Sequence, residues 1–579
     1  MSSTQALSFS LDHSMGYVLR VDTSAVWAHV TDEDTLSRVS VGSLIGVQSP
    51  EASSTLVGMV DRVTRDWREE EPDDSESDEP TILQSERNLV RIVLLGTHSR
   101  ISRKEIGTFK RGADSYPRLD APVWPIEGEN LRQLMGLLSA GIDEDKQLDL
   151  GTFVNDPSTR AVADGNRWFQ RHAAVLGSTG SGKSWAVALI LERAGNLDHP
   201  NLIVLDMHGE YGPLAKPSGD APAIGQQLKI AGPGDSGNLD DGIIHLPWWL
   251  LTQEEMFALV LDRSEDNAPN QAARFAHHVR ALKEEAIVAA GDPALAARFT
   301  LDSPVFADLE ELVKRLEADD TQMVPGAGTN VKQGPFFGKL GRFVARLNSR
   351  KSDRRYAFMF SPDPSTEEFG WVAKLASRLL AAKPGIKIVD FSEVPSDVLP
   401  IVVGVFARLL YQIQFWTKDD ARTPLTFVCD EAHLYLPADE TRVSEQRALD
   451  AFERIAKEGR KYGVSLMVIS QRPSDVSKTV LSQCNNFMIL RLTNDQDRQV
   501  VQRLVPDNLS GLTASVPLLD IGEAIVLGDS LLLPSRLRLN QPAVKPTSAT
   551  RDFWTEWQEK QPNEASIAEA VANLRRQGR

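Results

Sequence analysis

Residues 177–184 read Gly-Ser-Thr-Gly-Ser-Gly-Lys-Ser, which matches the phosphate-binding pattern G-x-x-x-x-G-K-[ST] in full. Glycines in such a loop let successive backbone N–H groups curl around phosphates, and the helix that follows presents its positive N-terminus to them. We expect Lys183 to reach the β- and γ-phosphates of ATP and the Ser184 hydroxyl to bind Mg²⁺. The expected nucleotide contacts in this segment are Gly177, Ser178, Thr179, Gly180, Ser181, Gly182, Lys183, Ser184 and Trp185.

Two carboxylates form the second candidate group. The apolar run 425–429 ends in Asp430 and Glu431. At the end of a buried strand, Asp430 can support Mg²⁺ and Glu431 can act as the general base for the attacking water. Many strands end in acidic residues, so the pair by itself is weak evidence for an ATPase site. It becomes strong evidence when it occurs together with the phosphate loop. The sequence has no Asn-Lys-x-Asp segment to read guanine, so these residues predict hydrolysis of ATP rather than GTP.

Gln471 follows the apolar run 464–470, where it can contact the γ-phosphate or the attacking water, or simply cap a strand.

A basic helix end precedes that run and contains Arg454, Lys457, Arg460 and Lys461. These cations can complement the helix dipole. Alternatively, one arginine can enter a neighbouring subunit's nucleotide site, where such a finger is worth about 10³–10⁵ in rate.

His208 and Glu210 follow the apolar run 201–206. The carboxyl edge of a parallel sheet is where α/β proteins bind their ligands. Two such residues do not make a metal site by themselves. We therefore expect both side chains to position water, Mg²⁺ or a neighbouring subunit near the nucleotide.

The predicted secondary structure that positions these residues changes along the chain from mainly β to alternating β and α. Short β-branched runs with turn residues between them predict a small barrel or sandwich in residues 1–115. After residue 171, strands alternate with helices, which predicts a parallel α/β sheet. Residues 250–383 read as helical, and so as an insertion that divides the α/β core into residues 116–249 and 384–540, before a tail at 541–579.

Composition limits the kinds of partner and compartment. The 579 residues carry 63 Lys and Arg against 80 Asp and Glu, a net charge of −17, so any nucleic-acid surface must be a local basic lining. The acidic stretch 69–79 predicts a solvated hairpin extension. Cys429 and Cys484 are too few for a disulfide framework or a zinc site. Residues 398–416 predict a buried or amphipathic helix rather than a membrane span, so we expect a soluble, cytoplasmic protein.

The densest basic stretch lies inside the predicted helical insertion. Around a ring of subunits it would track DNA phosphates without reading bases. It could equally be a solvated helix face, or pair with neighbouring acids. Its members are Lys332, Lys339, Arg342, Arg346, Arg350, Lys351, Arg354 and Arg355.

Six segments resemble, in the same order, motifs of HerA-like hexameric DNA translocases, within the HerA/FtsK group of P-loop ATPases. They are GYVLRV with VGSLIGV, DMHGEY, CDEAHLYLP, KEGRKYG, ISQRPSDVSKTVLSQCNNFMILRLTN and GEAIVLGDSLLLPSRLRL. The resemblance spans nearly the whole chain. It implies a RecA-like ATPase core, an N-terminal β-barrel and a C-terminal brace that packs on a neighbouring subunit. It also implies roles for the phosphate loop with Lys183 and Ser184, the acidic pair Asp430 and Glu431, the sensor Gln471 and the trans-acting finger Arg460.

The resemblance further implies a homohexamer that pumps double-stranded DNA through its channel. Such a ring would work with a separate nuclease or other effector, NurA-type or sirtuin-like, in DNA-end processing or anti-phage defence. An ATP-gated scaffold that activates an effector without moving DNA fits the same residues. A secretion or conjugation motor is disfavoured by the N-terminal barrel and by the lack of a predicted membrane span.

Overall fold

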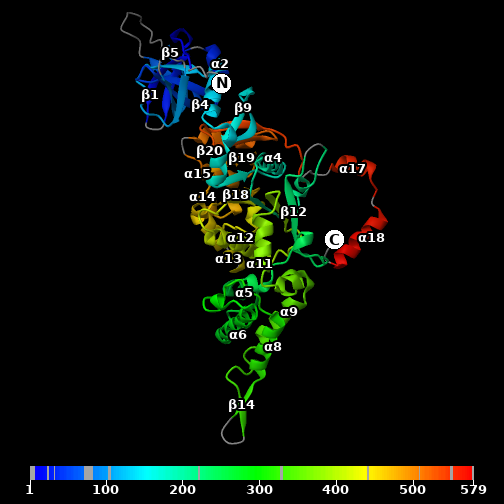
Figure 1. The fold of residues 1–579 in the computed structure, drawn as a ribbon. Helices are drawn as coiled ribbons and strands as arrows, with labels where there is room; N and C mark the ends of the chain where they lie inside the picture. The colour runs from blue at the N-terminus through cyan, green and yellow to red at the C-terminus, as the bar shows by residue number, and fades with distance from the viewer. Residues whose placement is uncertain are drawn as a thin grey trace, which may run out of the picture. The chain divides into compact units, whose positions relative to one another are not determined.

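The computed structural model describes residues 7–22, 25–31, 33–70, 83–101, 106–219, 222–325, 330–439, 443–506, 509–547, 552–561 and 563–576. Figure 1 shows the fold, coloured from the N-terminus to the C-terminus. The chain divides into two compact units. The first unit comprises Met1–Arg193, Ser470–Ser474 and Cys484–Pro542. The second unit comprises Ala194–Ile469, Asp475–Gln483 and Ala543–Arg579.

The first unit begins with a closed β-barrel. Its strands run in the order β2-β1-β7-β3-β4-β5, and β2 pairs again with β5 to close the ring, while β6 adds to β5 outside it. Their bounds are β1 (Gly16–Val21), β2 (Val26–Val30), β3 (Leu44–Gln48), β4 (Ser54–Glu70), β5 (Leu83–Ile101), β6 (Ile106–Arg111) and β7 (Pro122–Pro125). The predicted N-terminal barrel is confirmed, and it takes in β7, which lies beyond residue 115.

Alternating side chains fill the barrel interior. Val18, Val26, Ile45, Val60 and Ile92 are all essentially inaccessible and belong to one apolar cluster. The barrel is followed by α2 (Gly128–Ala140), while the short α1 (Glu33–Arg38) lies between β2 and β3. Of the predicted acidic extension 69–79, the first two residues end β4, and residues 71–79 lie outside the described residues.

The rest of the first unit is a second set of strands in the order β10-β19-β20-β21-β8-β9. The β10–β19 pair is parallel, and the other pairs are antiparallel. The strands are β8 (Gln147–Phe153), β9 (Asp156–Asp164), β10 (Ala173–Leu176), β19 (Asn486–Ile489), β20 (Glu523–Gly528) and β21 (Ser535–Leu539). The helices α3 (Gly165–Gln170), α4 (Lys183–Gly195), α15 (Asp495–Leu504) and α16 (Ser510–Ala514) accompany them.

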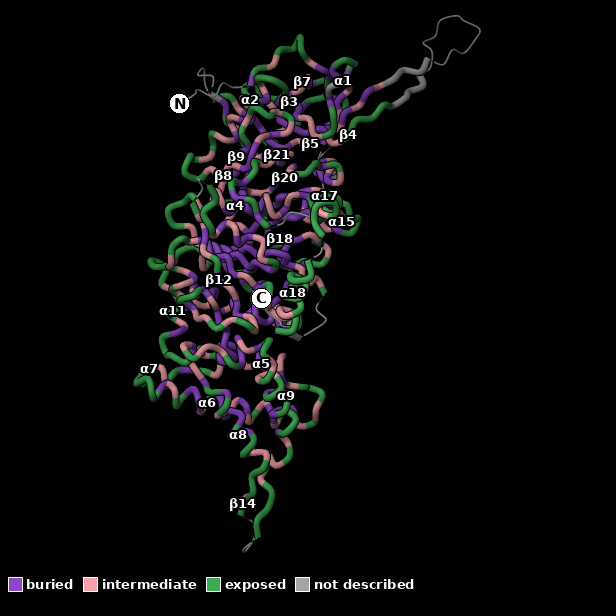
Figure 2. Tube along the Cα trace, turned by 90° about the vertical axis from the view of Figure 1, so that its right-hand side faces the viewer, coloured by how far each residue is buried: buried purple, intermediate pink, exposed green. Residues whose placement is uncertain are grey.

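The second unit is built on parallel strands in the order β13-β12-β16-β11-β17-β18. They are β11 (Leu202–Asp206), β12 (Gly225–Ile230), β13 (Ile243–Ile244), β16 (Ile386–Asp390), β17 (Leu425–Cys429) and β18 (Val464–Ser470). Every residue of β11, β17 and β18 is buried, as continuous apolar runs in a parallel sheet require (Figure 2). The predicted α/β fold class is confirmed.

Helices α12 (Leu399–Trp416), α13 (Val443–Glu458) and α14 (Lys478–Ser482) belong to the same unit. By length and composition alone, α12 could cross a membrane, but 67% of it is buried inside the protein. Burial on this scale is typical of a core helix, as the interrupted apolar pattern indicated. The tail forms α17 (Phe553–Glu559) and α18 (Glu564–Arg576).

The insertion between β13 and β16 is helical, as expected. It contains α5 (Gln253–Val260), α6 (Ala268–Ala289), α7 (Pro293–Ala296), α8 (Leu309–Thr321), α9 (Gly341–Ser352), α10 (Ala357–Phe360) and α11 (Trp371–Leu380). A small antiparallel hairpin, β14 (Met323–Pro325) with β15 (Val331–Gln333), joins α8 to α9. Edge-to-face contacts of Phe275 with Trp248, Phe257 and Phe343 form part of its core.

Candidate active site

The phosphate loop lies between β10 and the start of α4 at Lys183 in the first unit. Gly180 and Gly182 have φ of 74° and 96°, the left-handed region where a glycine costs least. The loop is anchored at its start, because Gly177 N–H donates to Ser470 O at 3.2 Å and Ser178 N–H to Arg491 O at 2.9 Å. The backbone is therefore shaped to wrap an anion at a helix N-terminus.

Two neighbours hold this loop from the side. Gly522, just before β20, donates its N–H to Ser181 O at 3.5 Å. The Thr179 hydroxyl donates to the side-chain oxygen of Gln471. The predicted sensor Gln471 thus contacts the phosphate loop directly, and Thr179 is its partner.

The acidic pair follows β17 in the second unit. Asp430 and Glu431 are 1% and 4% exposed. The Tyr211 hydroxyl donates to Asp430 Oδ1 at 3.4 Å, and the Tyr435 hydroxyl donates to the Asp430 carbonyl oxygen at 3.0 Å. His433 Nδ1 lies 3.3 Å from Glu431 Oε2. Two buried tyrosines therefore fix Asp430, while an imidazole lies beside the predicted general base.

The backbone of Glu431 is unusual for a residue with a side chain. Its φ and ψ are 42° and 49°, which places it in the left-handed helical region. For a residue other than glycine this conformation costs about 1–2 kcal/mol. Such strain is found where function requires a side chain to point in one direction, as expected of a general base.

The loop after β11 is a third candidate group, and it lies with the acidic pair in the second unit. Both Asp206 oxygens accept backbone N–H groups, from Glu210 and from Tyr211, each at 3.0 Å. Gly209 turns this loop with a φ of 70°. Burial, together with the nearby charges of Asp390 and Glu210, raises the pKa of the Asp206 carboxyl to about 6 against the opposing effect of the two N–H groups.

His208 and Glu210 occupy this loop with different exposure. His208 is exposed and Glu210 is half-buried. The carbonyl oxygen of Glu210 accepts the Thr547 N–H at 2.8 Å, so the tail of the chain holds the loop. Among the described residues there is no group of three or more His, Cys, Asp or Glu side chains placed to hold a metal ion.

Arg460 lies in a four-residue 3₁₀ turn, Gly459–Tyr462, between α13 and β18, and its side chain is exposed. β17 and β18 are parallel, with Leu425 opposite Val464 and Cys429 opposite Val468. Arg460 therefore precedes the amino ends of these strands, whereas Glu431 follows the carboxyl end of β17. Five residues of strand, about 16 Å at 3.3 Å per residue, separate the two edges.

The chain is similar in sequence to proteins of one family. A family model described as helicase HerA, central domain, matches residues 148–410. The DNA double-strand break repair helicase HerA of Pyrococcus furiosus is 26% identical over 423 residues, 68% of this chain and 69% of that protein. The protein of the same description from Sulfolobus acidocaldarius is 28% identical over 401 residues, 68% of this chain and 70% of its own. The chain is a HerA-like ATPase. Among solved structures, VirB4 of Thermoanaerobacter pseudethanolicus is 17% identical, with 70% of this chain and 98% of VirB4 covered and a TM-score of 0.45.

In this HerA-like ATPase, much of the basic stretch in the helical insertion is paired within the chain. Arg346 binds Glu265 at 2.8 Å and the Val260 carbonyl oxygen at 2.8 Å, and it lowers the pKa of Glu265 to about 2. Arg350, Lys351 and Arg355 form ion pairs with Asp397, Glu310 and Asp353, and Lys339 Nζ donates to the Pro335 carbonyl oxygen. Lys332, Arg342 and Arg354 are exposed, and Arg342 also makes a long ion pair of 3.8 Å with Glu265.

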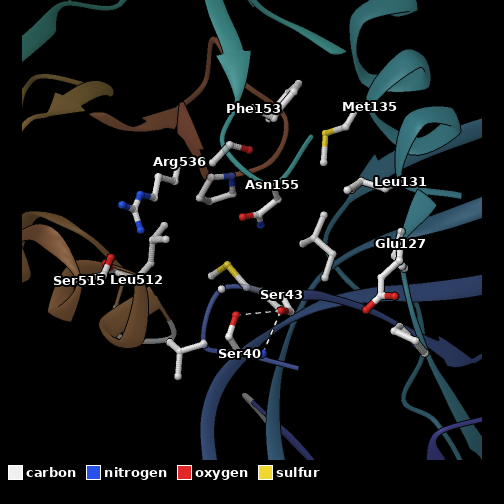
Figure 3. Close-up of a pocket in the computed structure, with 18 of the residues that line it drawn as sticks. Ser40, Ser43, Glu127, Leu131, Met135, Phe153, Asn155, Leu512, Ser515 and Arg536 are labelled. Atoms are coloured by element: carbon white, nitrogen blue, oxygen red, sulfur yellow. Dashed lines mark hydrogen bonds between the residues drawn. The ribbon is translucent and has the colours of Figure 1, made fainter. Parts of the chain in front are cut away.

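A cavity of about 430 Å³ lies elsewhere in the first unit (Figure 3). Residues of the barrel, α2, α16 and β21 line it, among them Met59, Met135, Leu512 and Arg536. None of the predicted nucleotide contacts lines this cavity. The cavity is therefore separate from the ATPase residues of the HerA-like core.

Three residues that the sequence did not single out belong to the site. Asp206, Tyr211 and Tyr435 are buried and fix the DMHGEY loop or Asp430. Tyr211 and Asp206 lie inside the motif DMHGEY, and Tyr435 inside CDEAHLYLP. Aromatic residues beside an acidic motif were thus the available signal.

Proposed function

We propose that this chain is an ATP-driven translocase of double-stranded DNA that acts as a homohexameric ring. The observation that carries the proposal is the position of Arg460, an exposed arginine at the amino edge of the strands whose carboxyl edge carries Glu431. An arginine finger at that edge has to serve another subunit's nucleotide. Relatives described as double-strand break repair helicases support action on DNA.

The residues of the phosphate loop and the acidic pair fit ATP and Mg²⁺. Mg²⁺ in such sites is bound by one or two protein oxygens together with substrate phosphates, and it neutralises charge that develops on them. Ser184, at the start of α4, and Asp430, a buried carboxylate, would be the residues whose oxygens bind such a metal. We therefore assign these two residues to a metal that arrives with its nucleotide.

Each catalytic step is assigned to a residue of this chain. Lys183 holds the β- and γ-phosphates, and the loop glycines present their N–H groups to them. Glu431, held beside His433, takes the proton of the attacking water. Gln471 contacts Thr179 of the loop and so senses the γ-phosphate. Arg460 of a neighbouring subunit neutralises charge in the transition state.

For the DNA track we propose Lys332 and Arg342, because both are exposed, with 83% of the Arg342 side chain accessible. Arg346 and Lys339 are assigned a structural role instead, since their donors are used within the insertion. The ring would thread DNA past these cations by phosphate contacts that read no sequence.

A separate nuclease or other effector, NurA-type or sirtuin-like, completes the proposal, in DNA-end processing or anti-phage defence within the cytoplasm. The test is ATPase activity with and without linear duplex DNA, followed by displacement of a triplex-forming strand. DNA-stimulated turnover with ATP-dependent displacement is the expected result. Light scattering of the ATP-loaded protein should give the mass of six chains.

One observation favours a second function. Arg346, Arg350, Lys351 and Arg355 are all ion-paired inside the chain, which leaves few cations of this stretch for DNA. An ATP-gated scaffold that assembles and activates an effector needs no DNA track. The scaffold function would be supported if the effector is activated only in the presence of ATP and no triplex displacement is observed.

A further inference from the structure

The turn that carries Arg460 is short. It spans only four residues, and Gly463, with a φ of 68°, ends it by donating its N–H to the carbonyl oxygens of Arg460 and Gly459. An exposed arginine on so short a turn can meet a phosphate reproducibly only if other contacts hold the turn. The side chain of Tyr462, two residues on, makes those contacts.

The Tyr462 ring packs against two aromatic rings of α12. Its centroid lies 4.9 Å from that of Phe415 and 6.0 Å from that of Tyr411, with interplanar angles of 56° and 81°. Tyr411 and Phe415 are four residues apart and so share one face of the helix. Tyr411 is only 2% exposed, which anchors this face in the core.

Arg422 covers Tyr462 from another direction. Its guanidinium carbon lies 5.5 Å from the centroid of the Tyr462 ring, within the range of a cation–π contact. The guanidinium also donates to the carbonyl oxygens of Gln414 and Thr417 at 3.0 and 2.7 Å, and it binds Asp419. Arg422 is therefore fixed at the end of α12, and with it the surface on which Tyr462 rests.

We propose that Tyr462 is a positioning residue that sets the place of Arg460 through this aromatic contact with α12. The inference rests on the proposed function of Arg460 as a finger for a neighbouring subunit. Catalytic groups displaced by about 1 Å lose about 100-fold in rate. Removal of the ring should therefore slow hydrolysis without changing how the same subunit binds ATP.

The experiment compares steady-state ATPase activity of the full-length assembled protein with its Tyr462→Phe and Tyr462→Ala variants. Tyr462→Phe keeps the ring and should retain the parent rate. Tyr462→Ala should lower kcat about 10- to 100-fold while KM for ATP stays near the parent value. Arg422→Gln, which removes the cation but no ring, is the second variant and should give a smaller decrease in kcat.

The double variant Arg460→Ala with Tyr462→Ala separates positioning from a general structural role. If Tyr462 acts through Arg460, the double variant should be no slower than Arg460→Ala alone. If Tyr462→Ala slows the Arg460→Ala protein as much as it slows the parent, or leaves the parent rate unchanged, the inference is overturned. Parent activity in Arg460→Ala alone would instead overturn the finger assignment, so the two failures are distinguishable.

Rings mixed from two variants distinguish the loss of a correctly placed finger from a general folding defect, because only the former should be restored by a neighbouring subunit. A Tyr462→Ala subunit keeps its own nucleotide residues and should fail only as a donor. Mixing it with Lys183→Ala subunits, which still donate Arg460, should restore turnover to the same extent as mixing Arg460→Ala with Lys183→Ala. Less recovery than the Arg460→Ala mixture gives would show that Tyr462→Ala damages its own site and would contradict the proposal.

Discussion

Arg460 and Glu431 lie at opposite ends of the same pair of parallel strands, β17 and β18. Glu431 follows β17 at the edge where the parallel strand β11 also ends. In the loop after β11, the Tyr211 hydroxyl donates to Asp430. Arg460 precedes β18 on a turn held to α12 through Tyr462. The same strands thus hold the acid at one edge and the arginine at the opposite edge, and the proposed action of Arg460 on a neighbouring subunit depends on this separation.

Replacement of Arg460 by alanine should leave ATP binding intact and lower turnover, by up to about 10³–10⁵-fold for a full finger. The measurement is kcat beside the affinity for a fluorescent ATP analogue. Mixed with Lys183→Ala, the Arg460→Ala protein should regain activity, because each variant supplies what the other lacks. Unchanged turnover in the single variant would mean that Arg460 is an ordinary basic residue at a helix end. Arg454 would then be the next candidate for the arginine finger.

Lys183→Ala should abolish turnover, since the β- and γ-phosphates lose their main side-chain cation. Glu431→Gln keeps the shape of the side chain but not its basicity, so it should bind ATP and hydrolyse it at least about 100-fold more slowly. Single-turnover hydrolysis and retention of labelled ATP measure both effects. Turnover of the Gln variant at the parent rate would be incompatible with Glu431 as the base.

The left-handed backbone of Glu431 gives a prediction about stability. Glu431→Gly and Glu431→Ala both remove the carboxylate, but only glycine adopts a φ of 42° without steric cost. The glycine variant should therefore be more stable than the alanine variant by about 1 kcal/mol. Thermal unfolding of the two inactive proteins measures the difference. Equal midpoints would mean that the backbone relaxes once the side chain is gone.

The DNA track is tested by charge reversal at residues that differ in their pairing. Lys332→Glu and Arg342→Glu should each reduce the slope of log affinity against log salt by about 0.9 for every DNA phosphate that is no longer neutralised. Lys332→Glu should leave thermal stability unchanged. Arg342→Glu should lower it slightly, because Arg342 Nη1 lies 3.8 Å from Glu265 Oε1. Arg346→Glu, the matched control, faces Glu265 and should destabilise the insertion because it replaces an ion pair with two like charges. If the salt dependence of DNA affinity is unchanged in assembled Lys332→Glu and Arg342→Glu rings, the DNA track lies elsewhere on the protein.

The sequence predicted the elements that follow a local pattern and missed what depends on tertiary contact. The phosphate loop and the acidic pair could be assigned because spacing and apolar runs place them at strand ends. The pairing of Arg346 with Glu265, 81 residues apart, has no local signature, so the sequence left open which cations of the basic stretch are paired with acids. The edge on which Arg460 lies follows from the parallel register of β17 and β18. The resemblance had already implied that Arg460 serves a neighbouring subunit, and the register supports that proposal by placing Arg460 at the edge opposite Glu431.

The last prediction concerns the buried carboxyl of Asp206, whose pKa of about 6 exceeds the value near 3.8 of an unperturbed aspartate. Between these two pH values the folded protein binds more protons than the unfolded chain. The free energy of unfolding should therefore fall by up to about 3 kcal/mol, from this one group, as pH rises from about 4 to about 6. Above pH 6 this contribution should stay constant. Asp206→Asn cannot ionise and should lack this contribution.

The measurement is the difference in unfolding temperature between parent and Asp206→Asn across that pH range. Asparagine can accept only one of the two N–H groups that Asp206 binds, so the variant should be less stable than the parent throughout. The gap should be largest near pH 4, where the native carboxyl is protonated and no charge is buried, and should shrink toward pH 6. A gap that is constant with pH would mean that Asp206 ionises at its ordinary value, held by the N–H groups of Glu210 and Tyr211 against the effect of burial.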